Sequence, residues 1–250
     1  MCLIVIGWQT DTRYPLAVAA NRDEFFARPT APLAWWDDEP DVLAGRDLQD
    51  GGTWLGLTRQ GRFAAITNYR DPSRLKLAPP SRGRLVSDFL AGNETPGDYL
   101  RRIESAAQAC NGFNLLVADA NELWWHSNVS GEVRKLQPGI YGVSNHLLDT
   151  PWPKLLGAKQ RFANALPDLP ATGELFTLLR DDTQHPDEVL PSTGVSLELE
   201  RKLSAIFVKT QGFNTRSSAV LWRDASGKIS FDEQSWLEDG SPGQKTTITT

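Results

Sequence analysis

Cysteine, histidine and long apolar segments are all scarce in this chain of 250 residues. Its two cysteines, Cys2 and Cys110, are too few for the disulfide framework of a small secreted domain, so we expect both to be reduced thiols. Its histidines, His126, His146 and His185, stand apart without metal-ligand spacing, which argues against a zinc site. No apolar segment is long enough to cross a bilayer, so we expect no transmembrane segment.

Positive charge is not in excess either, because 26 lysines and arginines face 31 aspartates and glutamates, for a formal net charge of -5. That balance disfavours nucleic acid or an anionic membrane as the main partner, since both select basic surfaces. The apolar segment at 2–6 is short, lacks preceding positive charges and ends at Gln9-Thr10-Asp11, unlike a signal peptide. We therefore expect an intracellular, cytoplasmic protein with one domain over 1–240 and a polar, mobile tail over 241–250.

Apolar periodicity predicts blocks of strands that alternate with blocks of helices. The predicted strands cover residues 3–8, 16–20, 53–58, 63–67, 113–118, 122–126, 133–136, 140–143, 217–222 and 228–231. The predicted helices cover residues 85–91, 99–109, 154–164 and 173–179, with a mixed segment at 197–207. This order differs from the strand-helix alternation of a parallel sheet and favours an α+β fold of two mainly antiparallel sheets with helices outside.

Cys2 is the residue that points most directly to chemistry. Removal of Met1 would leave a thiol and a free α-amine on one residue, and an α-amine with an ordinary pKa of about 7.7 to 8.0 can take the thiol proton near neutral pH. This combination predicts acyl transfer. The alternative is structural, because Cys2 opens the apolar segment at 2–6 and free cysteine is often a buried core residue.

A polar cluster, Asn21-Arg22-Asp23-Glu24, follows the predicted strand at 16–20 and is itself followed by two phenylalanines. In a straight strand Asn21 and Asp23 face one side, while Arg22 and Glu24 face the other, so Arg22 and Asp23 reach one site only if the strand ends there. An arginine near Cys2 would stabilise a thiolate, and a carboxylate would hold the α-amine. The alternative is a solvated turn with a weak ion pair.

Short motifs along nearly the whole chain resemble those of the NRDE family, also called the transport and Golgi organization 2 family. They are Met1-Cys2-Leu3-Ile4, Asn21-Arg22-Asp23-Glu24, Gly51-Gly52-Thr53-Trp54-Leu55-Gly56, Thr67-Asn68-Tyr69-Arg70, Ser81-Arg82-Gly83, Gly142-Val143-Ser144-Asn145 and Thr215-Arg216-Ser217-Ser218. That family resembles the N-terminal-nucleophile (Ntn) hydrolases related to penicillin V acylase, so the resemblance implies a four-layer αββα sandwich.

The resemblance also implies roles for individual residues. Cys2 would be the nucleophile, Arg22 and Asp23 its neighbours, and Arg216 a late arginine of the site. Asn68 and Asn145 would donate to the oxyanion. The acylases separate their arginine from their aspartate, whereas here the two are adjacent, so Glu24 could fill the place of Asp23.

The residues themselves leave some of these roles open. Asn68 and Asn145 each follow an apolar strand, where an amide could stabilise a tetrahedral intermediate or simply form a turn. The pair Trp35-Trp36 lies in a proline-rich, acidic loop and could line a pocket for an apolar ligand.

Two functions are therefore expected. One is a cofactor-free cysteine hydrolase that cleaves a small non-peptide amide or thioester through Cys2. The other is a haem-binding or lipid- and acyl-coenzyme A-handling protein on the same fold, in which a histidine could ligate haem. The enzyme requires Cys2, Arg22 and Asn145 to converge on a cavity with Met1 removed, whereas a carrier requires an apolar cleft and tolerates Met1.

Overall fold

Strand β1 (Cys2–Trp8) is buried on both faces, and its two sets of side chains enter different cores in the computed structural model, which describes residues 2–250. Ile4 and Ile6 pack into a core between two sheets, while Leu3 and Val5 pack against helices. Period-two alternation produces this division, because successive side chains of a strand point to opposite faces. Met1, and with it the question of its removal, lies outside the described residues.

The first sheet is antiparallel and has the strand order β10-β1-β2-β11-β12-β13. Its other strands are β2 (Leu16–Phe25), β10 (Gly139–Val143), β11 (Phe213–Arg223), β12 (Ile229–Trp236) and β13 (Pro242–Thr249). The second sheet is also antiparallel and runs in sequence order from β3 to β9. It comprises β3 (Thr30–Trp35), β4 (Val42–Asp47), β5 (Leu55–Thr58), β6 (Phe63–Asn68), β7 (Phe113–Ala118), β8 (Leu123–Ser127) and β9 (Glu132–Leu136).

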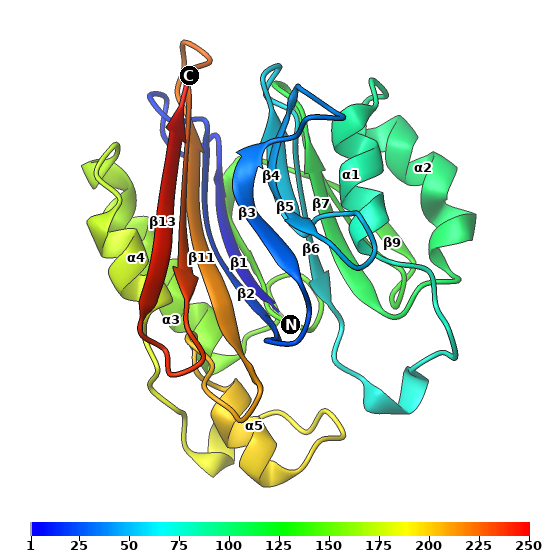
Figure 1. Cartoon of the computed structure of the whole chain (residues 1–250), viewed down its shortest axis with the longest axis vertical. Coiled ribbons are helices and arrows are strands. Elements are labelled where there is room, and N and C mark those ends of the chain that lie inside the picture. The colour runs from blue at the N-terminus through cyan, green and yellow to red at the C-terminus, as the bar shows by residue number, and fades with distance from the viewer. Residues whose placement is uncertain (1) are drawn as a thin grey trace.

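Helices cover the outer face of each sheet (Figure 1). Helices α3 (Pro153–Ala165) and α4 (Gly173–Leu179) share a core with the first sheet, and α1 (Gly83–Ala91) and α2 (Pro96–Ala107) share one with the second. The short helix α5 (Leu197–Leu203) follows α4 in the chain. The four layers confirm the predicted α+β, αββα sandwich of two mainly antiparallel sheets.

Two predictions about local structure are wrong, and two strands were not predicted. The segment 241–250 is not a mobile tail, because β13 pairs with β12 along most of its length (Figure 1). Strands β3 and β4 were not expected, since Pro32 interrupts β3 and Gly45 weakens the strand pattern of β4. Strand β2 continues through the polar cluster to Phe25, where the sequence suggested an end near Ala20.

The Trp35-Trp36 pair does not form an open loop. Trp35 ends β3, and Trp36 is buried in the core under α1 and α2, where its indole Nε1 donates to the Ala44 carbonyl oxygen at 3.1 Å. Within residues 2–250, no helix combines the length and the apolar character needed to cross a bilayer.

Candidate functional site

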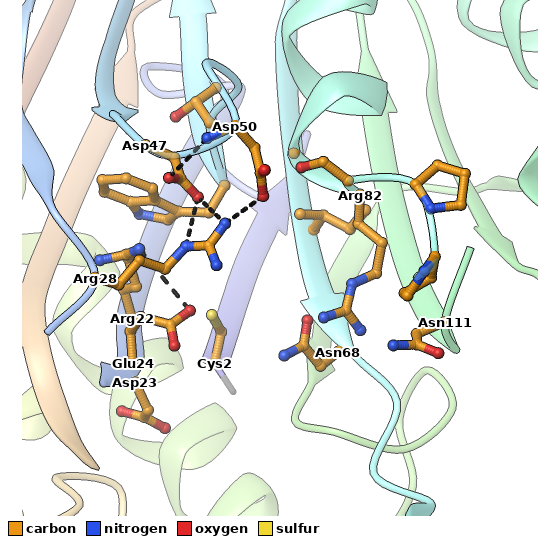
Figure 2. A pocket seen from close by; sticks show the side chains of 17 residues that line it. Cys2, Arg22, Asp23, Glu24, Arg28, Asp47, Asp50, Asn68, Arg82 and Asn111 are labelled. Carbon is orange, nitrogen blue, oxygen red and sulfur yellow. Dashed lines mark hydrogen bonds and ion pairs between the residues drawn. The ribbon is translucent and has the colours of Figure 1, made fainter. Parts of the chain in front are cut away.

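A cavity of about 220 Å³ opens between the two sheets, where β1 begins and β6 ends. Cys2, Arg22 and Asp23 contribute to it from the first sheet. Asn68 and Arg82 contribute from the second sheet and from the residue that precedes α1 (Figure 2). Four of the six residues predicted for the site, Cys2, Arg22, Asp23 and Asn68, therefore border one cavity.

Cys2 and Arg22 are direct cross-strand neighbours, since their Cα atoms are paired in the β1–β2 ladder. The Arg22 guanidinium stacks 4.2 Å from the Trp54 ring, donates through Nη1 to Thr30 Oγ1 at 3.1 Å and lies 3.9 Å from Glu24 Oε2. Cys2 is only 9% exposed, and this burial raises the pKa of its thiol. Nearby Arg22 acts in the opposite direction on that pKa but does not outweigh burial.

Asp23 points away from Arg22, as period-two alternation requires (Figure 2). Its carboxylate accepts a hydrogen bond from Thr215 Oγ1 at 2.7 Å, and burial raises its pKa although the Lys154 ammonium opposes this shift. Asp23 nevertheless borders the cavity. Asp23 is the residue of β2 that directly follows Arg22, whose Cα atom is paired with that of Cys2.

Asn68 and Asn145 have different positions. Asn68 ends β6, and its amide lies across the cavity from Cys2 (Figure 2). Asn145 does not border this cavity; it adopts a left-handed conformation with φ of 60° and donates through Nδ2 to the Asn68 carbonyl oxygen at 3.2 Å. Its own carbonyl accepts from the Arg70 amide at 2.8 Å. Asn145 thus supports the backbone of Asn68. Cys2 and Arg22 converge on the cavity with Asn68, and not with Asn145 as predicted.

Arg216 lies outside the cavity, at the bulge of β11 between Thr215 and Ser217. Its Nη1 donates to the carbonyl oxygens of Phe25 at 3.0 Å and Arg28 at 3.1 Å, and its guanidinium stacks 4.6 Å from the Phe26 ring. These contacts tie the segment after β2 to β11. Arg216 therefore shapes the wall that carries Arg22 and Glu24 without facing the cavity itself.

Several charged residues of the cavity were not predicted. Arg28 is held by Asp47 and Asp50, with nitrogen–oxygen distances of 2.6 and 2.5 Å. Arg82 lies on the opposite wall, beside Asn111 (Figure 2). Arg82 belongs to a motif that the sequence displays, but nothing in a single sequence shows that this motif reaches Cys2.

Histidine is absent from this cavity among the residues that the structure describes. His126 is fully buried in its strand, and His146 is engaged by Tyr69 and Thr150. The cavity therefore offers no histidine as an axial ligand for haem. The described part of the chain also contains no cluster of three or more histidine, cysteine or acidic residues arranged to hold a metal ion.

Comparison with known proteins identifies the relatives of this chain. A family model described as transport and Golgi organisation 2 matches residues 1–238. The Transport and Golgi organization protein 2 homolog of Bos taurus is 35% identical, over 99% of this chain and 97% of the relative. The Homo sapiens homolog is 33% identical, over 95% of this chain and 94% of the relative.

Two solved structures have similar folds. An N-acylethanolamine-hydrolyzing acid amidase ortholog from Caenorhabditis elegans has a TM-score of 0.45 and 10% identity, over 88% of this chain and 92% of that one. A mutant conjugated bile acid hydrolase from Clostridium perfringens has a TM-score of 0.45 and 9% identity, over 99% of this chain and 92% of that one. At such identities and scores, these similarities carry no activity over to this chain.

Proposed function

Because the chain belongs to the transport and Golgi organisation 2 family, whose name states no chemistry, we propose its chemistry from the cavity. The proposed function is a cysteine hydrolase that cleaves a non-peptide amide or a thioester through Cys2. One observation carries the proposal: Cys2, Arg22 and Asn68 border one cavity although they come from three strands in two sheets. The cavity is smaller than most sites for drug-sized ligands, so the part of the substrate beside Cys2 is compact.

The proposed reaction begins with attack of Cys2 Sγ on the carbonyl carbon of the substrate. The thiol proton passes to the Cys2 α-amine, which exists once Met1 is removed, and the carbonyl oxygen becomes an oxyanion that accepts from the Asn68 amide. The tetrahedral intermediate collapses, the carbon–nitrogen or carbon–sulfur bond breaks, and the leaving group takes the proton from the amine. Water then attacks the acyl-thioester, releases the acid and restores the thiol.

Because Cys2 is buried, the proposed attack needs the α-amine as the base that removes the thiol proton. Since burial raises the pKa of the thiol, the thiolate is not the resting form at neutral pH, and proton transfer must accompany attack. Asp23, on the helix side of β2, is the residue proposed to hold the α-amine. Glu24 instead partners Arg22 at 3.9 Å. The proposed location is the cytoplasm, where thiols such as that of Cys2 are kept reduced.

The first test is the intact mass of the native protein before and after treatment with iodoacetamide. We expect a mass that lacks Met1 and labelling of Cys2 before Cys110, because only Cys2 has an amine to take its proton. A panel of amides and thioesters should then be hydrolysed by wild type and by Cys110→Ser, but not by Cys2→Ala. Cys110 is the matched control because it is also a free, buried thiol.

Retention of Met1 in active protein, or hydrolysis by Cys2→Ala, would contradict the mechanism. The carrier function, with haem or acyl-coenzyme A as the ligand, would replace it if the protein bound these molecules tightly and consumed no acyl group. The lack of a histidine among the described residues of the cavity favours the hydrolase over a carrier with histidine-ligated haem.

A further inference from the structure

Three arginines border the cavity, and two of them have carboxylate partners. Arg28 Nε donates to Asp47 Oδ2 at 2.7 Å, and its Nη2 donates to Asp50 Oδ2 at 2.5 Å. Arg22 has Glu24 at 3.9 Å and the face of Trp54 at 4.2 Å. These two guanidinium groups are therefore compensated within the protein.

Arg82 is different. Among residues 2–250, the only hydrogen bond of its guanidinium runs from Nη1 to the neutral Gly112 carbonyl oxygen at 3.1 Å, and no carboxylate of that part of the chain lies within ion-pair distance. Burial lowers the pKa of Arg82, and Cys110, Cys2 and Glu24 oppose this shift without outweighing it. A partly buried guanidinium that borders a cavity and has no counter-ion in the described chain is placed to bind an anionic group of a ligand.

The donor geometry of Arg82 indicates which kind of anionic group it would bind. The Nε and Nη2 groups of Arg82 have no protein acceptor among the described residues, and together they form the planar fork that binds a carboxylate with two hydrogen bonds. The amide of Asn111 lies beside the guanidinium (Figure 2). Asp47 and Asp50 also border the cavity, so a phosphate dianion meets more repulsion than a singly charged carboxylate.

We infer that the substrate of this site carries a carboxylate group, which Arg82 binds across the cavity from Cys2. The class is a compact acyl amide or thioester with a free acid at the end away from the scissile bond. The acyl part of this inference rests on the proposed function, whereas the carboxylate part rests on Arg82 alone. Arg82 is thus a residue that determines specificity.

The test uses matched pairs of substrates: the mono-p-nitroanilides of succinic, glutaric and adipic acid, and the same compounds with the free carboxylate replaced by a carboxamide. For the best chain length, wild type should prefer the carboxylate by about 10- to 100-fold in kcat/KM, as expected for hydrogen bonds to a charged group. Arg82→Gln should lose this preference, which is measured as the ratio of kcat/KM between the two members of a pair. Arg84→Gln, the same charge change on an exposed neighbour outside the cavity, should behave as wild type.

A second measurement needs no turnover. Free glutarate, and not glutaramide, should slow the alkylation of Cys2 by iodoacetamide in wild type, and Arg82→Gln should abolish this protection. If Arg82→Gln fails to fold, Arg82→Lys keeps the charge without the fork, and it should retain part of the preference that wild type shows between paired substrates.

The outcomes separate the two proposals. Hydrolysis of both members of a pair at equal rates would leave the hydrolase in place and overturn the carboxylate site. Protection of Cys2 by glutarate that depends on Arg82, without hydrolysis of any compound, would support the carboxylate site and contradict the hydrolase with these substrates. The absence of both hydrolysis and protection would overturn the inference about Arg82.

Discussion

Gly52 is the position where a single methyl group should do most damage to the site. A Cβ atom there would lie 2.4 Å from the Gly83 carbonyl carbon, 2.6 Å from its oxygen and 2.7 Å from the Arg84 amide nitrogen. All three are backbone atoms at the start of α1, the helix that directly follows Arg82. Ordinary contacts begin near 3.4 Å, so the two backbones must separate by about 1 Å (3.4 − 2.4).

Overpacking of this kind typically costs about 1 to 3 kcal/mol, and we expect Gly52→Ala to destabilise the protein by that amount. The separation would also stretch the hydrogen bond from the Thr53 amide to the Gly83 carbonyl oxygen, which is 3.2 Å long. Arg82 would then move relative to Cys2, so the preference for a carboxylate substrate should fall together with stability.

Urea unfolding monitored by tryptophan fluorescence measures the stability change, with Gly157→Ala as the control. Gly157 lies within α3, and a Cβ there meets nothing within 4 Å, so alanine should stabilise the helix by about 0.5 to 1 kcal/mol. Equal stability of Gly52→Ala and wild type would refute the argument that close backbone contact fixes the start of α1.

Three further changes have defined outcomes. Ser218→Ala should lower the free energy of unfolding in urea by about 1 to 3 kcal/mol, because the buried hydroxyl donates to Asn21 Oδ1 at 2.6 Å and accepts from Trp236 Nε1 at 2.9 Å. Ser105→Ala, on the exposed face of α2, should change it little. Burial lowers the pKa of Lys154 from 10.5 to about 8. Its ammonium therefore disfavours folding by about 3 kcal/mol below pH 8, and this penalty disappears as the pH rises to 10.5. The unfolding free energy of wild type should include a matching rise over this pH range, and that of Lys154→Met should lack it. Deletion of residues 242–250 should lower the melting temperature and promote aggregation, since it exposes the edge of β12.

The order of elements was predictable because most strands carry their own apolar pattern. Two local sequence signals also match the structure: Gly61 in the turn before Phe63 has a φ of 80°, and Thr95, which precedes the first-turn proline of α2, accepts through Oγ1 from the Asp98 amide at 3.2 Å. Strand β13 was not predictable from the sequence, because an edge strand rich in threonine and lysine has one largely exposed face and resembles a loop in composition.

The site was only half predictable for a related reason. A nucleophile and its cross-strand neighbour follow from local sequence, but a wall formed by another sheet does not. Asn145 has the features of a site residue, yet its left-handed backbone and its bond to the Asn68 carbonyl make it a support. Arg82 lies in a motif that the sequence displays, but its position across from Cys2 and the absence of a carboxylate partner for it among residues 2–250 are visible only in the fold.

The polar cluster at residues 21–24 shows why four consecutive polar residues can occupy a central strand. Both faces of β2 are internal here, one toward the second sheet and the other toward helices. Arg22 and Glu24 take the cavity side, whereas Asn21 donates to the carbonyl oxygens of Leu179 and Ile206 at 2.7 and 2.9 Å, and Asp23 accepts from Thr215. The cluster is therefore part of a buried strand, with one face toward the cavity and the other toward the helices, rather than a solvated turn. Burial raises the pKa of the Cys2 thiol, and in the proposed hydrolysis the same low-dielectric surroundings would strengthen the hydrogen bond from Asn68 to the oxyanion.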